Sequence, residues 1–166
     1  MKKNKIHFYL ILAGAISILA IMLASCAENI EPSFTYIDAM AFISIKDRSG
    51  KNLLDPASER SFDHQKIKIF YKRETKWVEF YNPDLNWPRN FYISKRGETG
   101  EYVFGAGLET ETLIQWNESE SDTLITEFYH FPSNDGFRVN KIYHEGVLVY
   151  DYDDTGGKEA TFTIIK

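Results

Sequence analysis

Hydrophobic and polar residues alternate along most of the chain after residue 35, and this alternation predicts short β-strands. Within 66–73, Ile67, Ile69 and Tyr71 fall on one side of an extended chain and lysines fall on the other. Threonine, valine, isoleucine and aromatic residues, which favour strands, fill the same pattern elsewhere. The pattern predicts strands at 36–46, 66–73, 76–81, 91–95, 101–104, 109–116, 122–130, 138–144, 147–152 and 161–165.

Turn-forming residues separate these segments, as at Asp47–Gly50, Pro132–Gly136 and Glu145-Gly146. Nine to eleven short strands joined in this way predict a single all-β domain over 36–166. We expect an antiparallel β-sandwich, immunoglobulin-like or related. A closed barrel is the alternative, and the short, unequal strands favour the sandwich.

The first 25 residues follow a different pattern. Met1–Lys5 contains three lysines, and the 16 residues from Phe8 to Leu23 carry no charge. A basic start, an apolar run and then small residues are the order typical of a secretory signal peptide. We therefore predict a signal peptide over 1–25. An uncleaved membrane anchor is the alternative, although a spanning helix needs about 20 apolar residues.

Leu23-Ala24-Ser25-Cys26 resembles the lipobox at which bacterial lipoproteins are processed, and it matches at every position. The resemblance implies that a signal peptidase recognises Leu23, Ala24 and Ser25 and cuts before Cys26. It also implies a diacylglycerol on the Cys26 sulfur and a further fatty acid, such as palmitate, on the new amino terminus. Several acyl chains hold a protein stably on a membrane. Residues 26–35 would then form a lipidated tether.

Two further features limit the expected location and partners of the protein: the residue after Cys26, and the net charge of the chain without residues 1–25. Ala27 stands where, in the lipoprotein family, an aspartate would retain the protein in the inner membrane. The expected location is therefore the cell envelope, at the periplasmic face or the outer surface of the outer membrane. Removing the three leader lysines leaves 16 basic against 24 acidic residues, a net charge of −8 with histidine neutral. This charge argues against a nucleic-acid partner, and the only cysteine, Cys26, leaves no disulfide.

The sequence contains no catalytic motif, and we predict no enzymatic activity and no cofactor. His64, His130 and His144 lack metal-ligand spacing, and Gly-x-Ser-x-Gly is absent. A hydrolase site that assembles only in space is a less favoured alternative. No predicted helix follows Gly105-Ala106-Gly107 to bind a phosphate, so we expect these glycines to end a strand.

An acidic turn follows the strand predicted at 147–152. Asp151, Asp153 and Thr155 match the front half of a calcium loop, but Phe162 stands where a bidentate glutamate would be needed. We predict no metal site and interpret the segment as a polar turn between strands. Calcium binding is the alternative.

The three tryptophans divide into two groups. Trp77 and Trp116 lie in predicted strands and are expected in or beside the core. Trp87 lies in the proline-containing loop Asn82–Pro88. We expect it to pack that loop against the domain, and the alternative is that its ring stacks on a sugar.

Asp47–Pro56, followed by Ile67–Tyr71, resembles a pattern in small uncharacterised β-rich lipoproteins of Bacteroidetes-type bacteria, and the hairpin Lys141–Tyr150 is similar to theirs. The resemblance covers part of the chain and implies a β-rich envelope domain without a reaction. We expect a non-catalytic accessory or interaction domain, held on the membrane through Cys26, with a protein or glycan partner. A glycan-binding module of a polysaccharide-uptake system is the alternative.

Overall fold

The structure is a computed structural model, and it describes residues 36–97, 100–132 and 136–166. These residues belong to one compact unit. The predicted signal peptide, the predicted lipidation site at Cys26 and the predicted tether lie outside the described residues. Within the described ranges, no helix has the length and apolar character needed to cross a bilayer.

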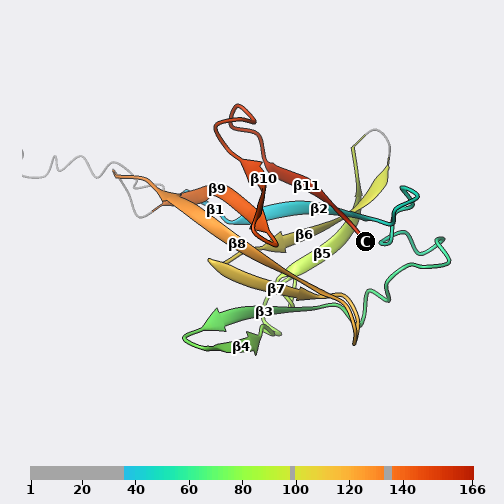
Figure 1. Cartoon of the computed structure of the whole chain (residues 1–166). Coiled ribbons are helices and arrows are strands. Elements are labelled where there is room, and N and C mark those ends of the chain that lie inside the picture. The colour runs from blue at the N-terminus through green and yellow to red at the C-terminus, as the bar shows by residue number, and fades with distance from the viewer. Residues whose placement is uncertain (1–35, 98–99, 133–135) are drawn as a thin grey trace, which may run out of the picture. The chain divides into compact units, whose positions relative to one another are not determined.

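The described chain is all β, as predicted, and no α-helix occurs in it. Turns occur as predicted at Asp47–Gly50 and Glu145-Gly146, whereas the strand predicted over 36–46 is divided at Ala39 into two strands of different sheets (Figure 1). The strands are β1 (Ile37–Asp38), β2 (Met40–Lys46), β3 (Lys68–Arg73), β4 (Lys76–Glu79), β5 (Phe91–Arg96), β6 (Glu101–Gly107), β7 (Glu111–Gln115), β8 (Ser121–His130), β9 (Phe137–His144), β10 (Val147–Asp151) and β11 (Ala160–Ile165).

The strands form the two sheets of a β-sandwich, which confirms the predicted fold class. One sheet has the order β1-β9-β8-β7-β3-β4, with β10 also paired to β9, and the other has the order β11-β2-β6-β5. Most neighbours are antiparallel, but β1 runs parallel to β9 and β11 runs parallel to β2. Alternation along a strand does not indicate the direction of its neighbour, so the sequence did not predict these two parallel pairs.

Tight turns set the register of two of the predicted hairpins. Glu74 has a φ of 53° between β3 and β4, and Arg73 pairs with Lys76 across the turn. Glu145 and Gly146 have φ angles of 50° and 79° between β9 and β10. Positive φ at both central residues gives a turn whose twist matches that of a hairpin.

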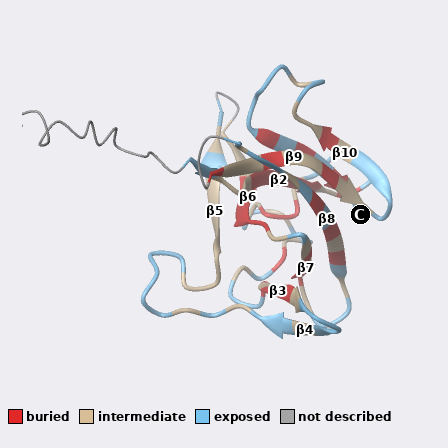
Figure 2. Ribbon diagram, turned by 90° about the vertical axis from the view of Figure 1, so that its left-hand side faces the viewer, coloured by how far each residue is buried: buried red, intermediate tan, exposed pale blue. Residues whose placement is uncertain are grey.

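The core lies between the sheets (Figure 2). The side chains predicted to share one face of β3 and its approach, Ile67, Ile69 and Tyr71, are all buried. Phe104 is fully buried at the centre, where its ring stacks on Phe91 and meets Trp116 edge-on. Burial on this scale stabilises the fold by roughly 25 cal/mol for each Å² of apolar surface removed from water.

Candidate functional site

Trp87 lies in the loop between β4 and β5, and its side chain is 48% exposed. Its ring stacks on Tyr92 of β5, with the ring centroids 4.6 Å apart and the planes inclined by 32°. Backbone hydrogen bonds hold the loop: the Asn82 amide donates to the Pro88 carbonyl at 2.7 Å, and the Asn90 amide donates to the Trp87 carbonyl at 2.8 Å. The tryptophan therefore both packs its loop on the sheet and presents an open face.

Tyr92 lies over the backbone of Gly105 in the neighbouring strand β6. The two residues are register partners, and a Cβ atom on Gly105 would lie 2.7 Å from Cζ of the tyrosine ring. Glycine inside a strand commonly marks such a close approach. The expectation that the Gly105–Gly107 segment ends a strand holds for Gly107 only, because Gly105 lies inside β6.

Two further residues adjoin this ring pair across the sheet, and the contact of Phe42 with Tyr92 is edge-on. Phe42 of β2 is the register partner of Gly105 on its other side, and its ring centroid lies 6.4 Å from that of Tyr92. Arg96 of β5 places its guanidinium carbon 3.6 Å from the centroid of Phe42 and also pairs with Glu159. A cation over a ring face is attracted by the ring quadrupole. We call Trp87, Tyr92, Phe42 and Arg96 the Trp87 platform.

Hydroxyl groups adjoin the Trp87 platform on the outer face of the same sheet. Phe42 pairs with Thr161 and Ser44 pairs with Thr163, while Ser94 lies two residues along β5 from Tyr92. Residues two apart in a strand share a face. Ala41, Ile43, Phe162 and Ile164 are buried in the core, which places these hydroxyl residues on the opposite, outer face. Phe42 and Ser44 are themselves buried on this face, whereas Trp87, Thr161 and Thr163 are exposed, so the accessible part combines one aromatic ring with hydroxyl groups.

The other two tryptophans lie as expected for core or half-core residues. Trp116 is fully buried directly after β7. Trp77 of β4 is half-buried, and the Lys72 ammonium lies 4.8 Å from its ring centroid. Neither ring offers the open face that Trp87 has.

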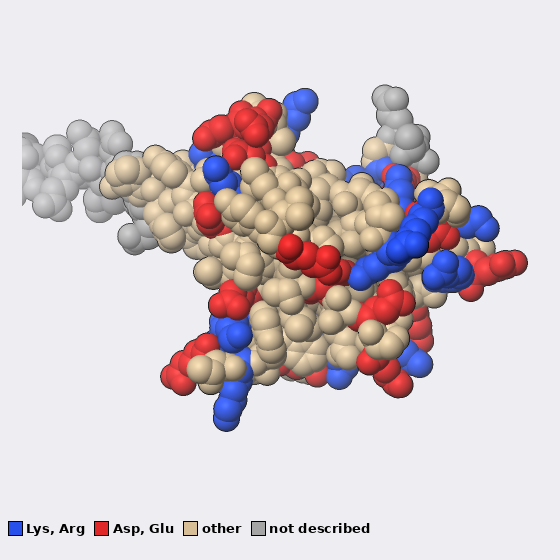
Figure 3. Space-filling model, in the orientation of Figure 1, with Lys and Arg blue, Asp and Glu red and all other residues tan. Residues whose placement is uncertain are grey.

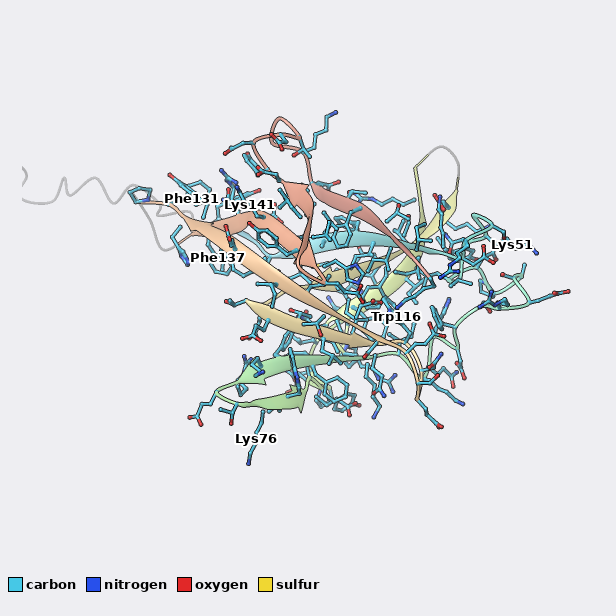
Figure 4. The ribbon with its side chains drawn as sticks, viewed as in Figure 1. Lys51, Lys76, Trp116, Phe131, Phe137 and Lys141 are labelled. Atoms are coloured by element: carbon cyan, nitrogen blue, oxygen red, sulfur yellow. The ribbon has the colours of Figure 1, made fainter. Side chains whose placement is uncertain are left out.

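A buried polar network surrounds Asp122 at the start of β8, close to Trp116 (Figure 4 labels the tryptophan). The carboxylate accepts hydrogen bonds from His144 Nε2 at 2.8 Å, from Lys166 Nζ at 2.6 Å and from the Trp116 indole. Burial alone would raise the pKa of Asp122, but the hydrogen bonds from its three partners outweigh burial and hold that pKa below its ordinary value.

The same network contains three potential metal ligands, Asp122, His144 and Glu145, whose ligand atoms lie within 4.8 Å of one another. Both oxygens of Asp122 already accept hydrogen bonds, and one of the donors is the Lys166 ammonium. A cation would have to displace that positive charge. The arrangement fits a structural connection between strands better than a metal centre.

The three histidines of the described residues have separate surroundings. His64 Nε2 lies 2.9 Å from the Leu54 carbonyl oxygen, and the His130 ring lies 5.7 Å from the Phe137 ring. His144 binds Asp122, and among the described residues no serine is hydrogen-bonded to it. These contacts supply two members of a triad at most.

The side chains of the acidic turn after β10 make ion pairs and hydrogen bonds within the protein. The Asp151 carboxylate pairs with Lys141 Nζ at 3.1 Å and also accepts the Asp153 amide at 3.0 Å. Thr155 donates its hydroxyl to the Tyr152 carbonyl at 3.0 Å. Among the described His, Cys, Asp and Glu side chains, no three converge at this turn.

A cleft of about 450 Å³ lies between the β3–β4 turn and the segment that follows β6, with Arg73, Glu109 and His130 in its walls. Arg73 binds Glu109 with both of its terminal nitrogens, and Lys72 pairs with Glu111, so most charges of the cleft are paired. In Figure 3, most of the visible face is neither acidic nor basic, and acidic and basic side chains lie close together at several places. This distribution does not favour a highly charged ligand.

Comparison with known proteins found no matching family model, no matching curated protein and no matching solved structure.

Proposed function

We propose that this chain is a lipid-anchored protein of the bacterial cell envelope whose β-sandwich is a non-catalytic interaction domain, and that its ligand is a glycan. The observation that carries the ligand assignment is the exposed Trp87 ring stacked on Tyr92. A loop held on a rigid sheet is a frequent location for a binding residue.

A sugar ring has the chemistry that this face accepts. Its C–H groups present an apolar face to an aromatic ring, while its hydroxyls reach neighbouring hydrogen-bonding groups. The exposed Thr161 and Thr163 on the same face, together with Arg96, supply such groups. The predicted net charge of −8 for the mature chain opposes polyanionic glycans. We therefore propose a neutral polysaccharide or oligosaccharide as the ligand class.

Lipid on Cys26 is the proposed link to the membrane. The support is the match of Leu23-Ala24-Ser25-Cys26 to a lipobox, and Ala27 favours the outer membrane. An anchored glycan-binding domain would hold a polymer beside the transport or degradation machinery of the envelope. Mass spectrometry of the mature protein should find acyl chains on Cys26, and Cys26→Ser should abolish them. Mature wild-type protein without acyl groups would contradict the anchor.

Glycan binding is tested with the whole lipidated protein in detergent on an array of neutral polysaccharides. Wild type should bind at least one glycan. Trp87→Ala should weaken that binding about tenfold, since an aromatic contact contributes about 0.5–1.5 kcal/mol beyond the burial of its surface. The matched control is Trp77→Ala, which removes a tryptophan from the other sheet and should bind as wild type does. A wild-type protein without a hit, or equal losses in the two variants, would contradict the proposal.

A protein partner is the second candidate ligand, and a separate surface favours it. Ile125, Tyr143 and Leu148 are register partners across β8, β9 and β10, and Ile125 and Leu148 are exposed. An apolar row of this kind suits a protein contact. Crosslinked recovery from the envelope should identify a partner that Leu148→Asp loses and Trp87→Ala retains. Recovery of the bait alone would contradict this candidate.

A further inference from the structure

The described chain begins in a group of aromatic residues. Tyr36 is 53% exposed, and Tyr129, near the end of β8, is 42% exposed. Phe131 follows β8 directly, beside the point where the described chain begins (Figure 4). We call this region the entry surface, and its members are Tyr36, Tyr129, Phe131, Arg138 and Tyr152.

Edge-on ring contacts and a cation hold the entry surface together. The Phe131 ring lies 5.8 Å from Tyr36 and 5.4 Å from Tyr129, inclined by about 80° to each. The guanidinium carbon of Arg138 lies 3.3 Å from the centroid of Tyr152 and 4.9 Å from that of Tyr129. Tyr36, Phe131, Arg138 and Tyr152 line a shallow hollow of about 330 Å³. The aromatic groups are thus held in place by one another.

The backbone fixes the position of this surface at the start of the domain. The Phe137 amide donates to the Tyr36 carbonyl at 2.8 Å, directly before β1 pairs with β9. The Phe131 amide donates to the Gly136 carbonyl at 3.0 Å. The first of these bonds holds Tyr36, the first described residue, against β9.

The length of the tether places this surface near a lipid on Cys26. Tyr36 is ten residues after Cys26. Ten residues span at most about 35 Å when fully extended, and about 17 Å on average as a flexible coil. A domain held by so short a connection meets the bilayer repeatedly, and its N-terminal end is the part joined most directly to the attachment point.

We propose that the entry surface docks on the lipid headgroup layer of the membrane that Cys26 anchors. Tyrosine is enriched at membrane–water interfaces because its ring is apolar and its hydroxyl is polar. Arginine keeps its charge among headgroups while its stem packs on apolar surface. On the face shown in Figure 3, the end of the domain where the described chain begins is mainly uncharged, which suits a zwitterionic layer. The inference rests on the lipid anchor of the proposed function and is independent of the glycan.

The test uses the lipidated full-length protein on vesicles of phosphatidylethanolamine and phosphatidylcholine. Cys26 is the only natural cysteine, so an added cysteine provides the only free thiol for a nitroxide label. Pro132→Cys places the label on an exposed residue beside Phe131, and Glu118→Cys places it on an exposed turn before β8, at the strand's other end. We expect the label at 132 to be several-fold less accessible to a water-soluble relaxation agent than the label at 118.

Flotation of the vesicles separates the possible failures. Protein that does not float lacks the anchor, and the docking inference then falls with it. Protein that floats with labels 132 and 118 equally accessible overturns docking alone. Protection of label 132 that rises with protein density at fixed lipid would assign the surface to a second copy and also overturn the proposal. Adding Tyr36→Ser and Phe131→Ser to the Pro132→Cys protein should restore accessibility while flotation stays unchanged.

Discussion

Lys166 Nζ lies 2.6 Å from Asp122 Oδ2, and this ion pair joins the two sheets of the sandwich. Lys166 follows β11 of the four-stranded sheet, and Asp122 belongs to β8 of the seven-stranded sheet. The lysine side chain is 16% exposed and the aspartate 2%. The pair is thus a largely buried connection between sheets whose other contacts are mainly apolar.

Asp122→Asn should destabilise the domain by about 3 kcal/mol at neutral pH, because removing one partner of a buried pair leaves an uncompensated charge. Urea unfolding followed by tryptophan fluorescence measures the change. Asp154→Asn, at an exposed carboxylate in the turn after β10, is the control and should change stability by less than about 0.5 kcal/mol. Equal effects of the two variants would show that the Asp122 network contributes no stability.

The same carboxylate should make stability depend on acid. The folded-state pKa of Asp122 lies below its ordinary value. Its contribution is therefore present above the unfolded pKa of about 4 and is lost as the pH falls through the folded pKa. The melting temperature of wild type should fall more steeply below pH 4 than that of Asp122→Asn. Parallel curves would contradict this assignment.

Tyr71 should limit stability in alkali. Burial raises its pKa to about 12, while the unfolded value is 10.0. Its contribution is complete below pH 10 and is lost as the pH rises through 12, a change of about 2–3 kcal/mol.

Tyr71→Phe removes the 2.8 Å hydrogen bond to the Gly107 carbonyl and should cost about 1 kcal/mol at neutral pH. Above pH 10 the variant should lose less stability than wild type. A phenolate absorbance titration should also lose its last-ionising tyrosine. A titration unchanged by the substitution would contradict the assignment.

Gly105→Ala should displace Tyr92 and disturb the Trp87 platform. The new Cβ would lie 2.7 Å from Tyr92 Cζ, so the ring must move, at a cost of about 1–3 kcal/mol. Glycan binding should weaken together with stability. In a Tyr92→Ala background the same substitution should cost almost nothing, and a double-mutant cycle measures the difference. Additive effects would show that the tyrosine does not rest on this glycine.

The neighbouring isoleucines of β11 test the two faces of the four-stranded sheet. Ile164 is 2% exposed and Ile165 is 58% exposed. Ile164→Ala should therefore cost about 2–5 kcal/mol, as a core truncation does, and Ile165→Ala less than about 1 kcal/mol. Urea unfolding of the two variants provides the comparison, and a reversed order would contradict the facing of β11.

Local sequence patterns predicted the strands well because alternation and turn chemistry are local properties. Ile67, Ile69 and Tyr71 are buried on one face as their spacing indicates. Glu74 and Glu145 adopt positive φ angles at the two expected hairpin turns, although neither is glycine. The parallel neighbours of β1 and β2 could not be predicted, because both edges of an alternating strand offer the same hydrogen-bonding groups.

The candidate site was predicted only in part. Trp87 was identified from its loop, but Tyr92 was not identified as the ring beneath it. The available signal was Gly105, since glycine within a strand indicates a close approach. The Asp122 network was missed because His144 and Lys166 are 22 and 44 residues away in the sequence. These residues meet only because three strands pack together, and no local sequence pattern indicates that packing.

The parallel pairing of β2 with β11 also sets the order in which the domain can be completed. Phe42 is the register partner of Thr161, 119 residues later in the chain. Contacts at such a separation slow folding, because a large loop must close before they form. β2 therefore has one unpaired edge until β11 joins it, even after its other edge has paired with β6. Pairing of β2 with β11 is accordingly expected late in the folding of the domain.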